Sequence, residues 1–333
     1  MPRVAWLAPN LAAACFGLMK LRPAREMIDS AERAGVLRRG MRVIESTSGT
    51  FGVALAMVCS RKPYQLVIVT DDATDERLRR RMEQMGARVE IVTSGGGSFG
   101  IQGARLDRLH ELLAEDPPAY WLNQYDNPLN PQSYAVVADY LLNRLGGFDV
   151  LVGPVGTGGS MVGMARRLRE VGLPIQAVAV DTCNSVLFGQ DDGPRLIRGL
   201  GNSLLPRNLD HQAFDYVSWV PGAAALAACR DLHRQYGLFL GPTSGAAFLV
   251  ARWWAASHPA SRVVMICPDE GHRYVDTVYC DNWYVKAVSG HDAAADPVVV
   301  ARPNERQGSW TLFHWARRTW DEVTGRSAEA LHA

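Results

Sequence analysis

The sequence lacks the features that mark membrane-spanning, secreted and nucleic-acid-binding proteins. No apolar run reaches the roughly 18 residues that a membrane span needs, and the N-terminus lacks the pattern of a cleaved signal peptide. Positive and negative side chains nearly cancel, 35 against 34, so no overall basic field favours nucleic acid. The six cysteines occur singly, without a CxxC pair, which argues against a zinc site or a disulfide framework. We therefore expect a soluble, cytoplasmic protein that binds no metal, membrane or nucleic acid.

Lysine is also scarce in this chain. Only three of the 35 basic residues are lysines, namely Lys20, Lys62 and Lys286. Any chemistry that needs a primary side-chain amine therefore has three candidates.

The 333 residues alternate short apolar runs with amphipathic stretches, which predicts an α/β fold. Strands as apolar as LVIVT and VVMIC suit parallel sheets that are buried on both faces. Two such series, over residues 35–125 and 150–270, indicate two parallel-sheet domains with crossover helices. The expected strands are residues 41–45, 65–70, 88–92, 150–155, 176–181 and 262–267.

The C-terminal part of the chain predicts a linker followed by a helix. Residues 289–308 lose periodicity and collect Asp, Ala, Pro and Gly. Beyond them Trp310, Phe313 and Trp320 recur near helical spacing, and Ser309 is a suitable N-cap. We expect this helix to pack on the body of the protein or on a partner subunit.

Three turns that follow predicted strands could hold chemistry, because ligands of open parallel sheets bind beyond the carboxyl ends of the strands. In residues 45–52 (ESTSGTFG), hydroxyls and backbone N–H groups at a helix start suit an anion such as a carboxylate. In residues 156–160 (GTGGS), small residues let backbone amides wrap a phosphate. Residues 241–247 (GPTSGAA) open a third helix. Each turn, taken alone, is also compatible with simple helix capping.

The glycine-rich turn at residues 156–160 fits neither of two common nucleotide motifs. It is not a P-loop, because no Gly-Lys-Ser/Thr follows, and it is not a GxGxxG fingerprint. A looser dinucleotide loop stays open, but no acidic residue stands at the distance that a nicotinamide oxidoreductase would need.

Taken together, these turns resemble a known family. The segments MKLRPA, TSGTFG, GTGGS, GPTSGAA and PDEGHRY occur in the same order as the corresponding motifs of pyridoxal-phosphate enzymes of the cysteine synthase type. The resemblance covers residues 3–288 and implies the fold-type II, tryptophan synthase β-like architecture. The segments YWLNQYDNPLNPQSY and RYVDTVYCDNW are similar to the N-(2-amino-2-carboxyethyl)-L-glutamate synthases. Those enzymes make 2,3-diaminopropionate precursors for siderophores and peptide antibiotics.

The resemblance implies a β-replacement reaction on an O-activated L-serine. The reaction would pass through an aminoacrylate and take an amine nucleophile such as L-glutamate. Lys20 would hold pyridoxal 5'-phosphate as an imine and move the substrate Cα proton. The other implied cofactor-binding residues are Thr50, Gly156, Thr157, Gly158, Gly159, Ser160 and Thr243. The implied substrate-binding residues are Ser46, Thr47, Ser48, Gln124, Tyr125, Arg198 and Arg207.

The family also implies an organisation of the whole chain. Residues 35–125 would form a smaller mobile domain that grips the substrate. Residues 1–34 and 126–288 would form a larger cofactor-binding domain, followed by the linker and helix of residues 289–333. The partners would be small amino acids and a second copy of the chain in a homodimer.

Several positions depart from the family pattern. Thr50 and Phe51 replace the usual Asn and Thr, and Leu204 stands where the diaminopropionate branch is expected to carry an arginine near the leaving group. Arg198 or Arg207 is then the candidate for that charge. The family's opening segment and first strand are expected to be missing. Two alternatives therefore stay open: a synthase with another nucleophile (sulfide, sulfite, hydroxyurea or another amine), and a cofactor-binding but inactive homologue.

Overall fold

The computed structural model describes residues 1–93, 100–115, 118–290 and 296–332, and the chain divides into two compact units. Unit 1 comprises Met1–Gly17 and Tyr134–His332, and unit 2 comprises Leu18–Ser133. Unit 2 therefore extends beyond the predicted domain of residues 35–125 and includes the segment that carries Lys20. None of the described helices is both long enough and apolar enough to cross a membrane.

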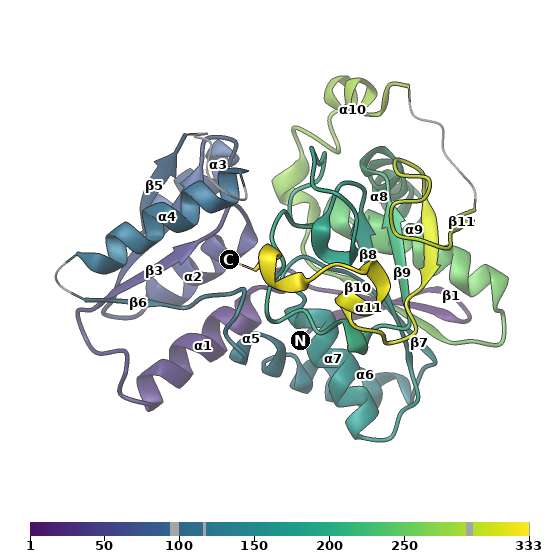
Figure 1. Cartoon of the computed structure of the whole chain (residues 1–333), viewed down its shortest axis with the longest axis horizontal. Coiled ribbons are helices and arrows are strands. Elements are labelled where there is room, and N and C mark those ends of the chain that lie inside the picture. The colour runs from purple at the N-terminus through teal and green to yellow at the C-terminus, as the bar shows by residue number, and fades with distance from the viewer. Residues whose placement is uncertain (94–99, 116–117, 291–295, 333) are drawn as a thin grey trace. The chain divides into compact units, whose positions relative to one another are not determined.

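Unit 2 is built around a four-stranded parallel sheet in the order β5-β4-β3-β6 (Figure 1). Its strands are β3 (Arg42–Ser46), β4 (Gln65–Asp71), β5 (Arg88–Val92) and β6 (Ala119–Trp121). Its helices are α1 (Leu21–Arg33), α2 (Thr50–Cys59), α3 (Glu76–Gln84), α4 (Gly100–Ala114) and α5 (Leu129–Gln132).

Alternating side chains of this sheet face two different layers of helices. Val43 and Ile68 belong to one buried cluster with residues of α1, α2 and α3. Ile44 and Val67 belong to a second cluster with leucines of α4. The apolar character of both faces explains why these strands have continuous apolar sequences.

Unit 1 contains an eight-stranded sheet in the order β1-β2-β10-β7-β8-β9-β12-β11. Its central strands from β2 to β9 are parallel, and β1 and β12 pair antiparallel with β2 and β9. The strands are β1 (Arg3–Ala8), β2 (Leu11–Cys15), β7 (Val150–Pro154), β8 (Gln176–Thr182), β9 (Tyr216–Val220), β10 (Val263–Cys267), β11 (Val298–Val299) and β12 (Thr311–His314). The α-helices are α6 (Ala135–Leu145), α7 (Gly159–Glu170), α8 (Gly222–Tyr236), α9 (Pro242–Ser257), α10 (Asp281–Val288) and α11 (Trp320–Thr324).

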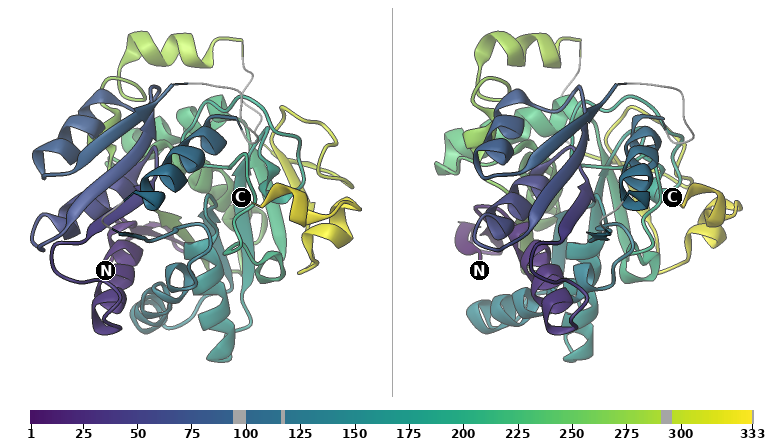
Figure 2. Two further views of the ribbon diagram at one scale, coloured as in Figure 1. Left: turned by 60° about the vertical axis from the view of Figure 1, so that its left-hand side comes forward. Right: turned by 90° about the vertical axis from the view of Figure 1, so that its left-hand side faces the viewer.

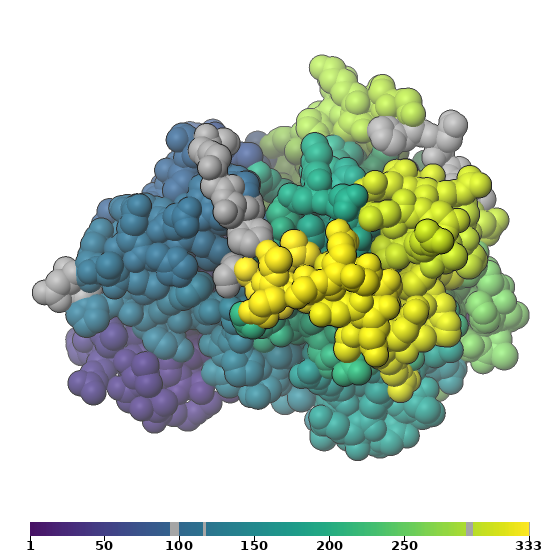
Figure 3. Space-filling view, in the orientation of Figure 1, coloured from purple at the N-terminus to yellow at the C-terminus, as the bar shows by residue number. Residues whose placement is uncertain are grey.

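The helices of unit 1 differ in how deeply they are buried. Twelve of the sixteen residues of α9 are buried against the sheet and against α8. In contrast, α10 has no buried residue and protrudes from the surface of the unit (Figure 3).

The structure confirms the two parallel-sheet α/β architecture but contradicts two details expected from the sequence. A strand does precede β2, because β1 forms an antiparallel edge strand beside it. The helix expected after Ser309 is instead β12, which pairs with β9. Helical structure follows later, in the short α11 and in a 3-10 helix at Ala328–Leu331. Residues 291–295 of the expected linker lie outside the described residues. Both side views in Figure 2 show the C-terminal segment, in yellow, along the outer side of the large sheet.

Candidate active site

Lys20 occupies a protected position in unit 2, immediately before α1. Its side chain is half-buried, and its Nζ lies 5.6 Å from the centre of the Phe51 ring. Removal from water lowers the pKa of the Lys20 amine to about 8, and the nearby charge of Glu45 opposes that shift. Lys62 instead bonds to carboxylates of Asp29 and Glu32, and Lys286 lies exposed on α10. Of the three lysines, Lys20 therefore best fits an amine that takes up and releases protons near neutral pH.

Glu45 joins the candidate residues on the evidence of the structure. It is fully buried near the end of β3, where burial raises the pKa of its carboxyl group to about 8. One carboxyl oxygen accepts the Ser46 N–H at 2.9 Å, and the other accepts the Gln124 N–H at 3.3 Å. The sequence feature that could identify Glu45 is its position directly before the Ser-Thr-Ser-Gly turn.

The turn after β3 holds the predicted substrate-binding hydroxyls of Ser46, Thr47 and Ser48. The Gln124 side-chain N–H donates to the Ser46 carbonyl at 3.0 Å, so two of the predicted residues do meet. The Ser46 hydroxyl is buried without a hydrogen-bond partner in the part of the chain that the structure describes. The Thr47 hydroxyl accepts the Gly49 N–H at 3.2 Å, directly before α2 begins at Thr50. This arrangement suits a small anionic group, which would use the free hydroxyl and the start of the helix.

Tyr125 and Phe51 give the same part of unit 2 an apolar boundary. Both are buried, with 8% and 2% of their surface exposed. Burial raises the pKa of the Tyr125 hydroxyl, so this group stays neutral at physiological pH.

The glycine-rich turn of unit 1 begins α7 and packs closely against neighbouring segments of the chain. Gly158 caps the helix with a positive φ of 80° and no side-chain cap. A Cβ atom at Gly158 would lie 2.8 Å from the Leu209 Cα, and one at Gly156 would lie 3.2 Å from the Gly199 carbonyl oxygen. Only glycine fits this close to the neighbouring chain, and the backbone N–H groups at the start of α7 suit a phosphate group.

Thr243 lies in the first turn of α9, where two predicted motifs come together. The Gly241 N–H donates to the Asp269 carbonyl at 3.1 Å, so the GPTSGAA turn contacts the PDEGHRY segment. A Cβ atom at Gly241 would lie 2.2 Å from a carboxylate oxygen of Asp269, which explains the glycine. The Ser244 hydroxyl beside Thr243 is buried and has no partner among the described residues. The hydroxyls of Thr243 and Ser244 lie at the start of α9, a position from which a hydroxyl can hydrogen-bond to a polar atom of a bound ring.

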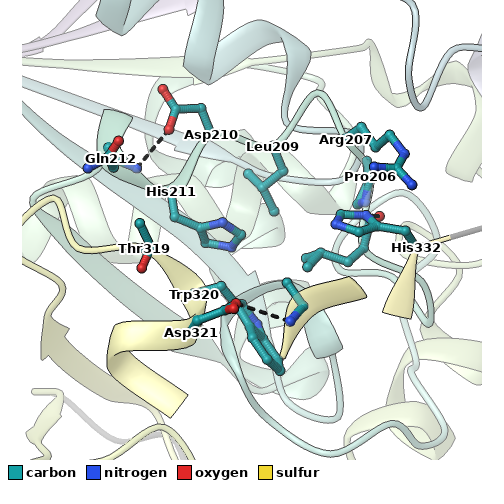
Figure 4. A pocket seen from close by; sticks show the side chains of 12 residues that line it. Pro206, Arg207, Leu209, Asp210, His211, Gln212, Thr319, Trp320, Asp321 and His332 are labelled. Atoms are coloured by element: carbon teal, nitrogen blue, oxygen red, sulfur yellow. Dashed lines mark hydrogen bonds between the residues drawn. The ribbon is translucent and has the colours of Figure 1, made fainter. Parts of the chain in front are cut away.

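The two arginines predicted near the leaving group lie on exposed positions. Arg198 is exposed, and Arg207 forms an ion pair with Glu329 at 3.2 Å. Arg207 lines a cavity of about 300 Å³ together with His211 and His332 (Figure 4). A third arginine, Arg195, is largely buried in the same loop.

Arg195 holds this loop together. Its guanidinium donates to the Asn184 carbonyl and the Ser203 hydroxyl, both at 2.5 Å. Leu204, where the family comparison expects an arginine, is completely buried. The assignment of Arg198 or Arg207 to the leaving group therefore stays a prediction.

Comparison with known proteins places these features in a family. The family model described as "Pyridoxal-phosphate dependent enzyme" matches residues 15–269, so the chain belongs to the pyridoxal-phosphate dependent enzymes. The match includes Lys20 and all three of the turns described above.

Individual relatives narrow the comparison further. N-(2-amino-2-carboxyethyl)-L-glutamate synthase of Ralstonia nicotianae is 36% identical over 291 residues, which are 86% of each chain. The enzyme of the same name from Cupriavidus metallidurans is also 36% identical, with the same coverage. The O-acetylserine dependent cystathionine β-synthase of Helicobacter pylori has a similar structure, with a TM-score of 0.76 and 28% identity over 83% of this chain and 94% of that chain. A hydrogen sulfide-producing enzyme of Fusobacterium nucleatum also has a TM-score of 0.76, with 28% identity over 82% of this chain and 96% of that chain.

Proposed function

We propose that this enzyme replaces the β-substituent of an O-activated L-serine with an amine nucleophile such as L-glutamate. The observation that carries the proposal is the family match over residues 15–269, which includes Lys20 and the three turns. Burial lowers the pKa of the Lys20 amine to about 8, which suits a proton acceptor. The two synthases that are 36% identical support an amine as the acceptor. The product would be a precursor of 2,3-diaminopropionate for siderophore or peptide-antibiotic biosynthesis.

Each part of the candidate site has a defined task in this proposal. Pyridoxal 5'-phosphate, when bound through Lys20, supplies an electron-withdrawing ring next to the substrate Cα. Once released from the cofactor, the Lys20 amine would accept the Cα proton and later return it. The substrate carboxylate would be held by Ser46, Thr47, Ser48 and Gln124. The Tyr125 ring would limit the space for the substrate side chain.

The remaining assignments concern the cofactor itself. Backbone N–H groups of residues 156–160 would hold its phosphate, aided by the positive end of α7. Thr243 would meet the ring nitrogen, and Thr50 would contact the ring hydroxyl with a shorter reach than the usual Asn.

The first experiment measures the reaction product and identifies the lysine that binds the cofactor. Purified enzyme with O-acetyl- or O-phospho-L-serine and L-glutamate should give the amine adduct by mass spectrometry, and pyruvate when no acceptor is present. Borohydride reduction of the cofactor-loaded protein should place the label on Lys20, and Lys20→Ala should abolish both label and product. A label on Lys62 or Lys286 would show that the lysine assignment is wrong.

A second candidate function uses the same chemistry with another donor or nucleophile. The complete burial of Leu204 and the exposure of Arg198 and Arg207 favour a less charged leaving group than phosphate. We therefore expect O-acetyl-L-serine to react as well as O-phospho-L-serine or better. If glutamate gives no adduct but sulfide does, the cysteine synthase-like alternative replaces the main proposal. If neither donor reacts in cofactor-loaded protein, the chain is an inactive homologue.

The proposal also covers the oligomeric state of the protein and its location in the cell. We expect a cytoplasmic homodimer, which light scattering of the purified protein and cell fractionation would test. The mobility predicted for the smaller domain also stays a prediction.

A further inference from the structure

Two free cysteines of unit 1 end neighbouring strands of its sheet. Cys15 is the last residue of β2, Cys267 is the last residue of β10, and the two residues are direct partners in this parallel strand pair. The Phe16 N–H donates to the Cys267 carbonyl at 2.9 Å, so the two chains stay paired just beyond Cys15. Neighbouring strands lie about 4.8 Å apart, and the Cα atoms of a disulfide lie roughly 4.4–6.8 Å apart. The backbone spacing at this pair therefore suits a disulfide.

The two side chains also lie on one face of the sheet. Side chains alternate between the two faces of a strand, so direct partners of a parallel pair share a face. In agreement with this rule, every second residue of β2 and of β10 belongs to one buried cluster, which includes both Cys15 and Cys267. Cys267 is completely buried, whereas 7% of Cys15 is exposed. A small, neutral oxidant therefore reaches Cys15 first.

The two thiols also differ in how readily they ionise. Hydrogen bonding to the Cys267 thiol lowers the pKa of Cys15, whereas burial raises the pKa of Cys267 well above its usual value. The thiolate is the form of cysteine that reacts with peroxides. Exposure and ionisation thus both favour Cys15 as the sulfur that an oxidant attacks.

The remaining cysteines are placed differently. Cys229 belongs to the same buried cluster, but its Sγ donates to the Leu240 carbonyl at 3.3 Å. Cys59 is buried in unit 2, and Cys183 and Cys280 are half-buried in other parts of unit 1. The pair at the ends of β2 and β10 is therefore the one that strand pairing itself brings together.

We propose that Cys15 and Cys267 form a reversible disulfide in the presence of hydrogen peroxide. The Cys15 sulfur attacks one peroxide oxygen, the O–O bond breaks and water leaves, so that Cys15 becomes a sulfenic acid. The Cys267 sulfur then attacks the Cys15 sulfur, an S–S bond forms, and the S–O bond breaks with release of a second water. Two thiols lose two electrons in total, one peroxide is reduced to two water molecules, and the thiol protons end in these waters.

A disulfide at this position should disturb the cofactor site. The Cβ atoms of direct partners lie near the strand spacing of about 4.8 Å, but those of a disulfide lie roughly 3.5–4.5 Å apart, so the bond draws the strand ends together. Lys20 follows Cys15 by five residues. Cys267 stands shortly before Asp269, whose carbonyl accepts the Gly241 N–H at 3.1 Å. We therefore expect the oxidised protein to bind pyridoxal 5'-phosphate less tightly. This consequence rests on the proposed function, whereas the disulfide itself does not.

Peptide mapping tests the disulfide directly. Trypsin should release the two cysteines in separate peptides, residues 4–20 and 263–273, each of which contains a single cysteine. The full-length protein is treated with hydrogen peroxide, remaining thiols are blocked with iodoacetamide, and the digest is analysed by mass spectrometry without reduction. The two peptides should appear joined, and a phosphine reductant should separate them. Two peptides that stay separate, or a Cys15 peptide joined to another cysteine, would overturn the inference.

Cys183→Ser is the matched control, because Cys183 lies outside the strand pair. This variant should form the same joined peptides as the wild type, whereas Cys267→Ala should not form them. If Cys267→Ala does not fold, the peptide map of the wild type still decides the question.

Titration with pyridoxal 5'-phosphate tests the consequence for the cofactor site. The oxidised wild type should bind the cofactor several-fold more weakly than the reduced protein and should recover after reduction. Cys267→Ala should bind it equally well before and after peroxide. An equal affinity of the fully joined and the reduced wild type would refute the effect on the cofactor site. An absence of reaction with both serine donors would instead defeat the proposed function and leave the joined peptides unchanged.

Discussion

His211 is a buried imidazole of unit 1 whose folded environment favours the neutral form. Its Nε2 donates to the Leu187 carbonyl at 2.7 Å, and its ring contacts Phe188 and Trp315 edge-on or tilted, at about 5 Å. Figure 4 shows the ring beside the cavity of unit 1 that Arg207 also lines. Burial lowers the pKa of His211 to about 4, and the Leu187 carbonyl and Asp210 oppose the shift.

This shift predicts a loss of stability on acidification. The unfolded chain binds a proton at His211 below about pH 6.5, whereas the folded chain does so only below about pH 4. Between these values the unfolded state holds more protons, so the free energy of unfolding falls as the pH falls. The loss at pH 5 should be on the order of 2 kcal/mol.

Urea unfolding at pH 7 and pH 5, followed by tryptophan fluorescence, checks the effect. His211→Gln removes the titration and should lose less stability than the wild type between the two pH values. His272→Gln, at an exposed position, should behave like the wild type. Equal losses in the wild type and His211→Gln would mean that other groups cause the acid sensitivity.

At the scale of elements, the turn between β7 and α7 depends on Gly158 for two reasons. Its φ of 80° strains any residue with a side chain, and a Cβ atom would meet the Leu209 backbone. Gly158→Ala should therefore lower both cofactor retention and stability. Gly172→Ala is the matched control, because Gly172 has a similar φ of 84° but nothing within 4 Å of an added Cβ.

The measurement compares both variants by urea midpoint and by cofactor absorbance after dialysis. Gly172→Ala should cost about 1 kcal/mol of backbone strain and retain cofactor. Gly158→Ala should cost more than this and release cofactor. Full retention in Gly158→Ala would argue against phosphate binding at this turn.

Some elements and motifs were predictable from the sequence, and others were not. Apolar runs such as VVMIC predicted six strands, and the order of the glycine- and hydroxyl-rich turns predicted the family. In contrast, β2 (LAAAC) consists mostly of alanine, which has little preference for strands, and it becomes a strand through pairing with β1 and β10. The role of Glu45 depends on Gln124, 79 residues away, and no local pattern reports such a contact.

Across the whole molecule, the C-terminal segment completes a core that the family model does not include. That model ends at residue 269, yet Trp310, Trp315 and Trp320 are each no more than 3% exposed. The Trp310 indole donates to the Ser218 hydroxyl at 3.0 Å, and Trp320 donates to the Val186 carbonyl at 3.2 Å. The segment therefore joins the body of unit 1 through buried aromatic side chains and through β12.

Removal of this segment should expose the sheet edge at β9 and the aromatic surface beneath it. A chain that stops at residue 296 should give less soluble protein and a lower urea midpoint, because buried tryptophans contribute several kcal/mol each (about 3–5 when truncated to alanine). A chain that stops at residue 326 keeps all three tryptophans and should be affected less. Equal solubility and stability of the two truncated chains would show that β12 and its tryptophans are dispensable.

The path of the chain sets an order in which the two units can be completed during synthesis. Unit 2 is one continuous stretch from Leu18 to Ser133, so all of its strands are available once that stretch has been made. Strand β2 of unit 1, by contrast, pairs in parallel with β10, which lies roughly 250 residues further along the chain. Until Cys267 has left the ribosome, the nascent chain holds a finished smaller sheet and an N-terminal hairpin whose principal partner does not yet exist.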